Sequence, residues 1–149
     1  CSKTFVSSTF WTERIGPTAA LKTLEIMENE KSWEFITKMG IYIQKNWEKI
    51  AENNNLKIRL NGIPALSKFS FISNNSLKYK TFICQEMLKR GYLASTECYV
   101  STCHTKEIVD KYLENLNEVF ALIKKHEDNN SIDDFLEGPV CIKGFNRLN

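Results

Sequence analysis

The apolar positions in the first third of the chain recur every three or four residues, which indicates amphipathic helices. One helix is predicted with Ile15, Ala19, Leu24 and Met27 on one side, and the polar run 29–31 is a break after it. A second helix is predicted to begin with Ser32 as its N-cap and to end at the asparagines 53–55. The pattern therefore places two long helices ahead of any strand.

The start of the first helix has two interpretations. Thr12 is a suitable N-cap, and so is Gly16, which would put Pro17 at the first helical position. A proline loses no hydrogen bond at that position, whereas a proline deeper in the helix would kink it. The sequence leaves both starts open.

Strict alternation replaces the helical period in the middle of the chain. Residues 57–60 and 68–73 alternate polar and apolar side chains, and the turn-forming residues 61–64 lie between them. Two further strands are predicted at 92–94 and 99–102. The sheet therefore has four short strands in this prediction.

Further helices are predicted around these strands. One opens at Ser76 and closes at Gly91, and a short one begins at Ser131 and ends before Gly138. Between them, Thr105 caps a long helix with one continuous apolar stripe. The stripe consists of Val109, Tyr112, Leu113, Leu116, Val119, Phe120 and Ile123.

The order of elements predicts an α+β fold. Short strands joined by tight turns favour a small, mostly antiparallel sheet with helices on one face. The first helix is too long and too exposed in its pattern to belong wholly to that layer. We expect this long helix to precede the layer and to bridge to another part of a larger protein.

Composition and charge bear on whether the protein binds nucleic acid or a membrane. The chain has 149 residues, of which 42% are hydrophobic and 26% charged, as in ordinary globular domains. A net charge of +2 gives no electrostatic footprint for nucleic acid or an anionic membrane. No apolar run reaches the roughly 18 residues that span a bilayer. We therefore expect neither nucleic acid nor a membrane as partner.

The cysteines favour a reducing compartment. There are five, an odd number, and no pair forms a C-x-x-C motif, so we expect a cytoplasmic protein without a disulfide framework. Cys98, Cys103 and His104 could be drawn together as a metal site, but the spacing lacks a second ligand pair. Small buried side chains on a strand are the favoured interpretation, and no metal is expected.

The sequence shows no recognisable set of catalytic residues. No Ser-His-Asp or Cys-His arrangement is evident, and no glycine-rich phosphate loop occurs. The two histidines, His104 and His126, fall at a helix start and in a solvated helix end. The residue chemistry alone therefore indicates an α+β domain and no reaction.

Two segments in register carry more specific information. The first is Ser7-Ser8-Thr9-Phe10-Trp11-Thr12-Glu13-Arg14-Ile15-Gly16-Pro17-Thr18-Ala19-Ala20-Leu21. The second is Leu88-Lys89-Arg90-Gly91-Tyr92-Leu93-Ala94, followed by Tyr99-Val100-Ser101 and His104-Thr105-Lys106-Glu107. Together they resemble the C-terminal part of class III (fold type I) pyridoxal-phosphate (PLP) enzymes. Within that family the likeness is greatest to glutamate-1-semialdehyde 2,1-aminomutase and its aminotransferase kin, over residues 5 to about 125.

The resemblance implies a cofactor site shared across a homodimer. In the family, a Thr hydroxyl and nearby main-chain N–H groups contact the cofactor phosphate in the partner's site, and the dimer forms through the large domain. Thr9 matches this position, with Ser8 beside it. A hydroxyl and backbone donors near a helix start suit a dianionic phosphate. The plainer interpretation of Ser8 and Thr9 is a polar turn or helix cap.

The same resemblance implies that the catalytic machinery lies elsewhere. The Schiff-base lysine of the family precedes this region, so we expect this chain alone to be inert although its parent is an enzyme. The predicted organisation is a bridging segment and helix at 1–30, a small α+β domain at 31–127 and a C-terminal extension at 128–149.

Two departures from the family concern the substrate. The loop 95–98 is shorter than the aminomutase loop that carries an acidic residue near the active site, and Glu97 is the candidate to replace that residue. Arg147, in a tail beyond the usual aminomutase end, could pair with a substrate carboxylate; a surface arginine is the plainer interpretation.

The resemblance implies that the parent protein converts glutamate 1-semialdehyde to 5-aminolevulinate, in tetrapyrrole biosynthesis. Two alternatives stay open at this point. One is another class III aminotransferase that acts on a small-molecule amino substrate, such as a sugar or amino-acid intermediate. The other is a non-catalytic interaction domain that uses the exposed face of the first helix for docking.

Overall fold

The computed structural model describes residues 13–142 and residue 144. The chain divides into two compact units, residues 1–33 and residues 34–149. The domain boundaries at residues 30 and 127 stay predictions.

Helix α1 (Ile15–Glu30) lies in the first unit. Arg14 is its N-cap, so Gly16 is inside the helix and the alternative that made it the cap is wrong; Thr12 lies outside the described residues. Pro17 sits in the first turn, where its missing N–H needs no partner. The helix ends at Lys31, whose left-handed backbone (φ 48°) makes the predicted break.

Helix α2 (Ser32–Asn53) buries the predicted apolar positions Ile43, Trp47 and Ile50. Ser32 is the first residue of this helix, not its cap. Within the described part of the chain its Oγ makes no hydrogen bond, so the predicted capping role is wrong. The helix ends at the predicted asparagines, and Asn55 turns the chain with a positive φ of 53°.

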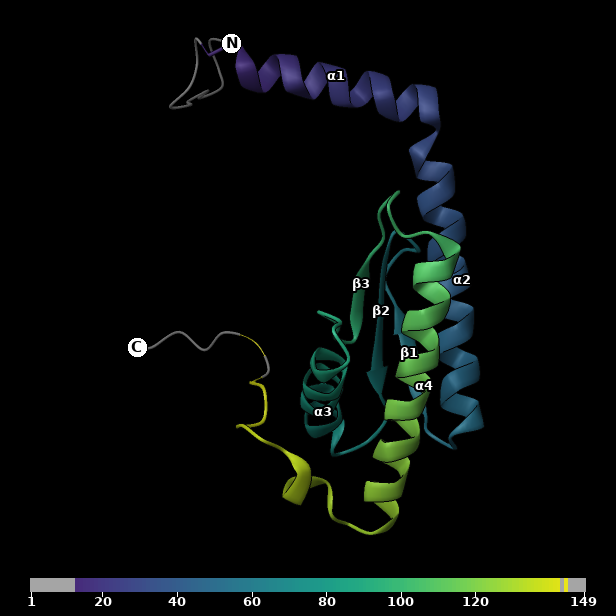
Figure 1. Ribbon diagram of the computed structural model, residues 1–149, viewed down its shortest axis with the longest axis vertical. Coiled ribbons are helices and arrows are strands. Elements are labelled where there is room, and N and C mark those ends of the chain that lie inside the picture. Colours follow the sequence, from purple (N-terminus) through teal and green to yellow (C-terminus); the bar gives the residue numbers. More distant parts are fainter. Residues whose placement is uncertain (1–12, 143, 145–149) are drawn as a thin grey trace, which may run out of the picture. The chain divides into compact units, whose positions relative to one another are not determined.

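The sheet has three strands, β1 (Ile58–Asn61), β2 (Leu66–Phe71) and β3 (Glu97–Tyr99), in the order β1-β2-β3 (Figure 1). Both pairings are antiparallel. Leu60 of β1 lies opposite Phe69, and Lys68 of β2 lies opposite Glu97.

The predicted strand at 92–94 is wrong, and β3 begins two residues earlier than the predicted strand 99–102. Hydrogen bonding explains both differences. The Tyr92 N–H donates to the Met87 carbonyl oxygen (2.9 Å) and so belongs to the end of the preceding helix. The Phe69 N–H donates to the Thr96 carbonyl (2.9 Å), which fixes the register of the following strand.

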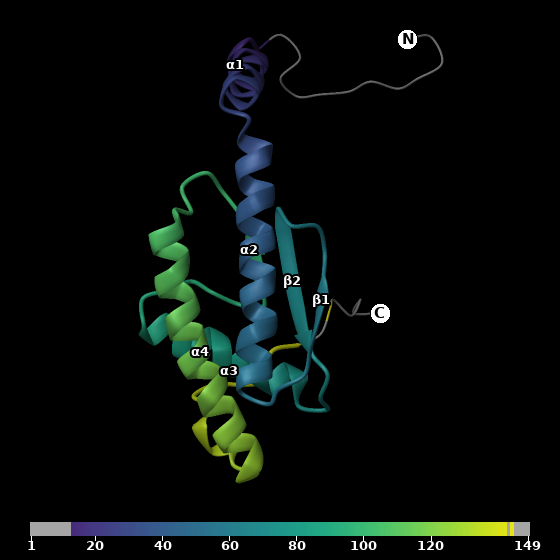
Figure 2. The same ribbon diagram turned by 90° about the vertical axis from the view of Figure 1, so that its right-hand side faces the viewer.

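One face of the sheet carries the core. Helices α2, α3 (Ser76–Lys89) and α4 (Lys106–Asp128) lie beside the sheet (Figure 2), and each supplies an aromatic side chain to this face. Trp47 of α2 meets Phe69 with ring centroids 4.8 Å apart, and Phe120 of α4 and Tyr79 of α3 lie 5.3 and 5.2 Å from Phe71. The predicted α+β class, with an antiparallel sheet and helices on one face, is confirmed.

Gly40 of α2 allows a close approach to the loop between β1 and β2. A Cβ atom at this position would lie 1.9 Å from the carbonyl oxygen of Pro64. Any larger residue would therefore push the helix and the loop apart.

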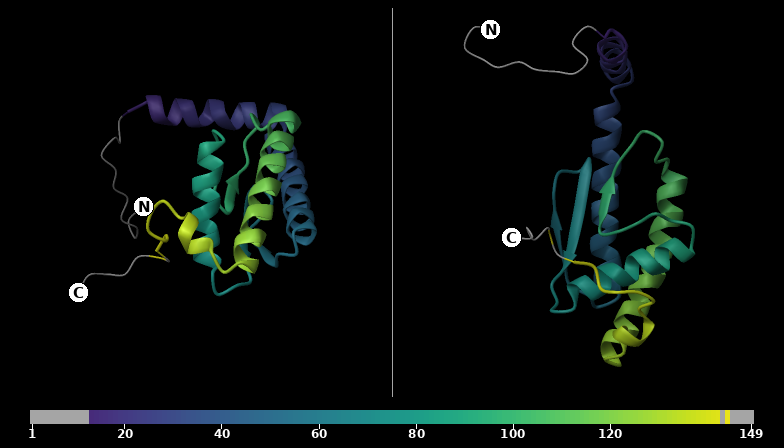
Figure 3. Two further views of the ribbon diagram at one scale, coloured as in Figure 1. Left: turned by 60° about the horizontal axis from the view of Figure 1, so that its bottom comes forward. Right: turned by 90° about the vertical axis from the view of Figure 1, so that its left-hand side faces the viewer.

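The chain after α4 folds back along α3. Its short helix, predicted from Ser131, is the 3₁₀ turn η1 (Ile132–Phe135) (Figure 3). Residues 131–142, which we call the strap, bind α3 through polar contacts. Gln85 accepts from the Glu137 N–H (2.8 Å) and donates to the Phe135 carbonyl (2.9 Å), and Thr81 accepts from the Cys141 N–H (2.9 Å).

A search of the described residues for a helix long and apolar enough to cross a membrane finds none.

Candidate functional site

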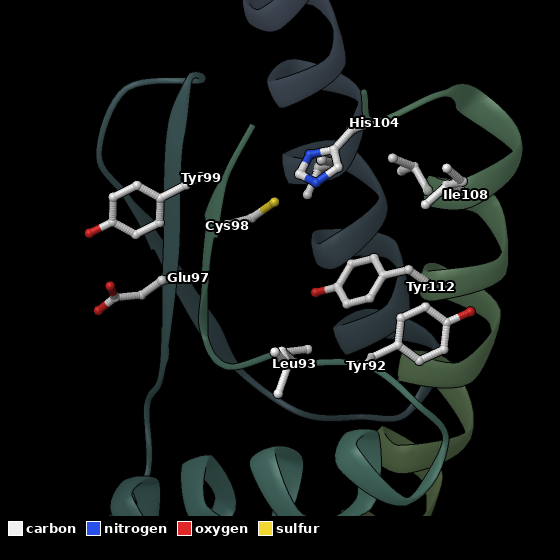
Figure 4. Close-up of a pocket in the computed structure, with 11 residues that line it drawn as sticks. Tyr92, Leu93, Glu97, Cys98, Tyr99, His104, Ile108 and Tyr112 are labelled. Carbon is white, nitrogen blue, oxygen red and sulfur yellow. The ribbon is translucent and has the colours of Figure 1, made fainter. Parts of the chain in front are cut away.

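A cavity of about 330 Å³ opens between β3, the segment 92–94 and the first turns of α4 (Figure 4). We call it the β3–α4 pocket. Its walls are mostly apolar and include Ile43 of α2 and Ile108 and Val109 of α4. The polar atoms that face it belong to Cys98, His104 and Tyr112.

Tyr112 reaches the pocket from the apolar stripe of α4. Its ring points toward β3 (Figure 4), and its hydroxyl accepts a hydrogen bond from the Trp47 indole N–H at 3.1 Å. Burial raises the pKa of Tyr112 well above its usual range. The phenol therefore stays protonated and keeps its own O–H free to donate.

Cys98 is the central residue of β3, and its sulfur points into the pocket (Figure 4). Burial raises the pKa of the Cys98 thiol. A thiol with a raised pKa is a weak nucleophile and a weak metal ligand, because both functions need the thiolate. The side chain therefore acts as a small neutral group.

His104 is held by the turn that leads into α4. Its backbone N–H donates to the Ser101 carbonyl (3.1 Å), and Thr105 next to it caps the helix by accepting from the Ile108 N–H (3.4 Å). The Ser101 N–H donates to Nδ1 of the imidazole at 3.3 Å. Nδ1 therefore acts as a hydrogen-bond acceptor, which leaves Nε2 as the ring nitrogen available to a ligand.

Glu97 lies at the pocket but its carboxylate points away from the interior, as does the phenol of Tyr99 (Figure 4). The expectation that Glu97 sits in a loop is wrong, because it opens β3. Its Oε2 lies 3.4 Å from Nζ of Lys68, the residue opposite it on β2. The pairing of β3 with β2 thus places the Glu97 carboxylate on the outer face of the sheet, beside the Lys68 ammonium.

The other predicted site residues are not among the described residues that line this pocket. Ser8, Thr9 and Arg147 lie outside the described residues. Of the two cysteines in the candidate metal site, Cys103 is exposed while Cys98 is half-buried. Across residues 13–142 and 144, no group of three His, Cys, Asp or Glu side chains could hold a metal ion.

His126 has a structural environment. It is buried, with its ring centroid 3.9 Å from that of Phe135 and 5.6 Å from that of Phe82. The expectation of a solvated surface histidine is therefore wrong, because the strap covers the end of α4.

Sequence analysis missed the role of Tyr112. The pattern assigned it to the core stripe, which is correct for its ring but says nothing of its hydroxyl. A phenol within a stripe whose other side chains are all hydrocarbon is itself a signal, because a buried hydroxyl needs a partner or a cavity.

The pocket thus combines apolar walls with a few polar side chains that point inward. Tyr112, His104 and Cys98 can each donate a hydrogen bond to an uncharged acceptor. Glu97 is the one charged residue among the described lining residues, and it faces outward. The arrangement suits binding of an uncharged group.

Comparison of sequences finds relatives of this chain among known proteins. The chain is 26% identical over 128 residues to the 3-aminobutyryl-CoA aminotransferase of Cloacimonas acidaminovorans (strain Evry). The match covers 83% of this chain and 31% of that protein. A scan against protein-family models gives no match.

Comparison of structures shows a similar fold in a solved protein. The fold is similar to that of the Sphingopyxis sp. MTA144 FumI protein, solved in its PLP internal aldimine form, with a TM-score of 0.75 and 19% identity. The match covers 85% of this chain and 31% of that one. The chain therefore shares the fold of part of a PLP protein, and it spans about a third of the length of both proteins it matches.

Proposed function

We propose that this chain is the C-terminal small domain of a PLP-dependent aminotransferase. The observation that carries the proposal is the TM-score of 0.75 to a PLP protein over 85% of the chain. The aminotransferase relative agrees with it, because its match covers nearly the same share of the chain.

The described pocket does not fit PLP. The cofactor carries a phosphate dianion and needs a lysine for covalent attachment. Neither a lysine nor an arginine is among the residues that line the β3–α4 pocket. We therefore place the cofactor outside this pocket, held mainly by the rest of the parent protein, and expect the chain alone to be inert.

The part of the chain that fits the cofactor best by its chemistry is Ser8-Thr9. Hydroxyls beside backbone N–H groups satisfy phosphate oxygens. The proposed role is donation to the phosphate in the partner's site of a homodimer. Bound PLP would supply the electron sink for amino-group transfer from a small-molecule amine.

The position of Glu97 favours an ordinary aminotransferase over glutamate-1-semialdehyde 2,1-aminomutase. The aminomutase proposal needs an acidic residue on a loop near the active site. Here the acid belongs to β3 and pairs with Lys68 at 3.4 Å. A two-substrate reaction, in which a separate acceptor takes the amino group, is therefore the form we propose.

Product analysis with the purified parent protein tests this proposal. An aminotransferase converts its amine completely only when a separate oxo-acid acceptor is present. An aminomutase converts glutamate 1-semialdehyde to 5-aminolevulinate with no acceptor. Conversion of glutamate 1-semialdehyde without an acceptor would show aminomutase activity in place of the proposed two-substrate reaction. No amino-group transfer under either condition would overturn the proposal.

A further inference from the structure

The β3–α4 pocket has the size and walls of a small-molecule site. Its volume of about 330 Å³ falls at the lower end of the roughly 300–1,000 Å³ typical of ligand pockets. Two apolar residues at its rim are left in water, because Leu93 is 98% exposed and Ile108 is 50% exposed. A ligand that fills the pocket would cover part of both side chains.

The polar groups inside the pocket converge on its space. The thiol of Cys98 approaches from β3, and the hydroxyl of Tyr112 and the imidazole of His104 approach from α4 and its leading turn (Figure 4). Burial raises the pKa of Cys98 and of Tyr112, which keeps both protonated. These groups offer hydrogen bonds to an oxygen acceptor.

A charged group is disfavoured in the same space. An anion would lose its hydration without meeting a cation, because no lysine or arginine lines the pocket. A cation would meet Glu97 only by drawing its carboxylate away from Lys68, which lies 3.4 Å from it. The pocket is therefore complementary to an apolar group with one uncharged oxygen acceptor.

We propose that the β3–α4 pocket binds a short uncharged acyl group, with its carbonyl oxygen toward Tyr112 and His104. The binding is a property of this chain. The source of the acyl group rests on the proposed function: it is the end of the amine substrate remote from the amino group, carried as an ester, amide or thioester rather than as a free carboxylate.

The aminotransferase relative is consistent with this class. Its name specifies 3-aminobutyryl-CoA, in which the carboxyl end of the amino acid is a thioester and so has no charge. Glutamate 1-semialdehyde keeps a free carboxylate and would not enter a pocket without a cation.

Binding is tested on the 149-residue chain by NMR, with S-butyryl-N-acetylcysteamine as the neutral probe and butyrate as its charged counterpart. The thioester is expected to shift the backbone amides of Cys98, His104 and Tyr112 saturably. Butyrate is expected to bind at least about tenfold more weakly, because a buried carboxylate would be unpaired.

Two variants locate the site. Ala94→Leu adds carbon atoms to a residue that lines the pocket, and it should abolish binding while the rest of the spectrum stays folded. Ser70→Val, on the exposed face of β2, is the control and should bind as the parent sequence does. Should Ala94→Leu fail to fold, Tyr112→Phe serves instead and should weaken binding about fivefold through the lost hydroxyl.

Three results would overturn the inference: no saturable shift with the thioester, equal affinity for butyrate, or unchanged binding by Ala94→Leu and Tyr112→Phe. Each would leave the proposed function standing, because none involves PLP. Binding by the probe together with a parent protein that transfers no amino group would instead overturn the proposed function, and with it the assignment of the acyl group to an amine substrate.

Discussion

The indole N–H of Trp47 donates to the hydroxyl of Tyr112 at 3.1 Å and so ties α2 to α4 behind the β3–α4 pocket. Trp47 is fully buried and has no access to water. The pair therefore satisfies a donor that the core could not otherwise accommodate.

Removal of that acceptor should destabilise the fold. Tyr112→Phe leaves the indole N–H of Trp47 unpaired, and we expect the free energy of unfolding to fall by about 1–3 kcal/mol. Urea unfolding followed by circular dichroism measures the change. Tyr99→Phe is the matched control, because this side chain is 67% exposed and its hydroxyl meets water. A loss of equal size in both variants would contradict the role given to the hydrogen bond.

Gly40 should tolerate no side chain. In Gly40→Ala the new Cβ would lie 1.9 Å from the Pro64 carbonyl oxygen, and the backbone of α2 or of the loop must move. We expect a loss of about 2 kcal/mol or more, although alanine favours a helix over glycine by about 1 kcal/mol. Thermal unfolding checks this. Gly138→Ala, where a Cβ would have open space, should change the stability little.

The pH dependence of stability follows from the buried thiol. The raised pKa of Cys98 in the folded state means that the folded chain holds this proton more tightly than the unfolded chain does. Its contribution is therefore complete below the ordinary thiol pKa of about 8.5 and is lost as the pH rises above that value.

Comparison of Cys98→Ser with Cys103→Ser isolates this effect. Between about pH 8 and 10, the Cys98 variant should show a shallower fall in unfolding free energy than the original chain, and the Cys103 variant should show the original slope. Cys103 is exposed, which makes it the suitable control. Identical slopes in the original chain and in Cys98→Ser would refute the assignment.

Gln85 should hold the strap on α3. Its side chain accepts from the Glu137 N–H (2.8 Å) and donates to the Phe135 carbonyl (2.9 Å). Gln85→Ala should speed hydrogen exchange of the Glu137 amide about tenfold, because the loss of such contacts costs roughly 1 kcal/mol or more. Gln44→Ala, on α2, is the control. Unchanged protection of Glu137 in the Gln85 variant would show that other contacts hold the strap.

The sequence predicted the fold class because its strongest signals are local. The apolar stripe of α4 and the Thr105 cap depend on spacing within one helix, and both are present. The break at Lys31 is also local, since the run of polar residues ends one helix before the next begins.

Such local patterns could not exclude the strand predicted near residue 92, because pairing with a neighbouring strand decides whether a segment is a strand. Residues 92–94 look like a strand, yet the Tyr92 N–H completes the turn after α3. The place of β3 depends on its hydrogen bonds to β2, which no local period encodes. For the same reason, Glu97 lies in β3 and not in the loop that the sequence predicted.

The site was harder to predict than the fold. Cys98, His104 and Tyr112 are far apart in any single pattern, and each has a plain structural interpretation by itself. Only the packing of β3 against α4 brings their polar atoms around one cavity. Ser8, Thr9 and Arg147 stay predictions from the family resemblance.

Thr9 can be tested through cofactor affinity. In the purified parent protein, Thr9→Ala should weaken PLP binding by about 1–3 kcal/mol, the usual cost of a lost hydrogen bond to a charged group. A PLP titration followed by absorbance gives the affinity. Thr18→Ala, a nearby threonine on the exposed face of α1, is the control and should leave the affinity unchanged.

The most direct test of the central claim is an absorbance spectrum of the parent protein, taken before and after borohydride reduction. The account predicts a visible band of bound PLP that reduction converts to a covalent lysine adduct, and no such band for residues 1–149 alone. A parent protein that stays colourless and takes up no PLP would contradict it.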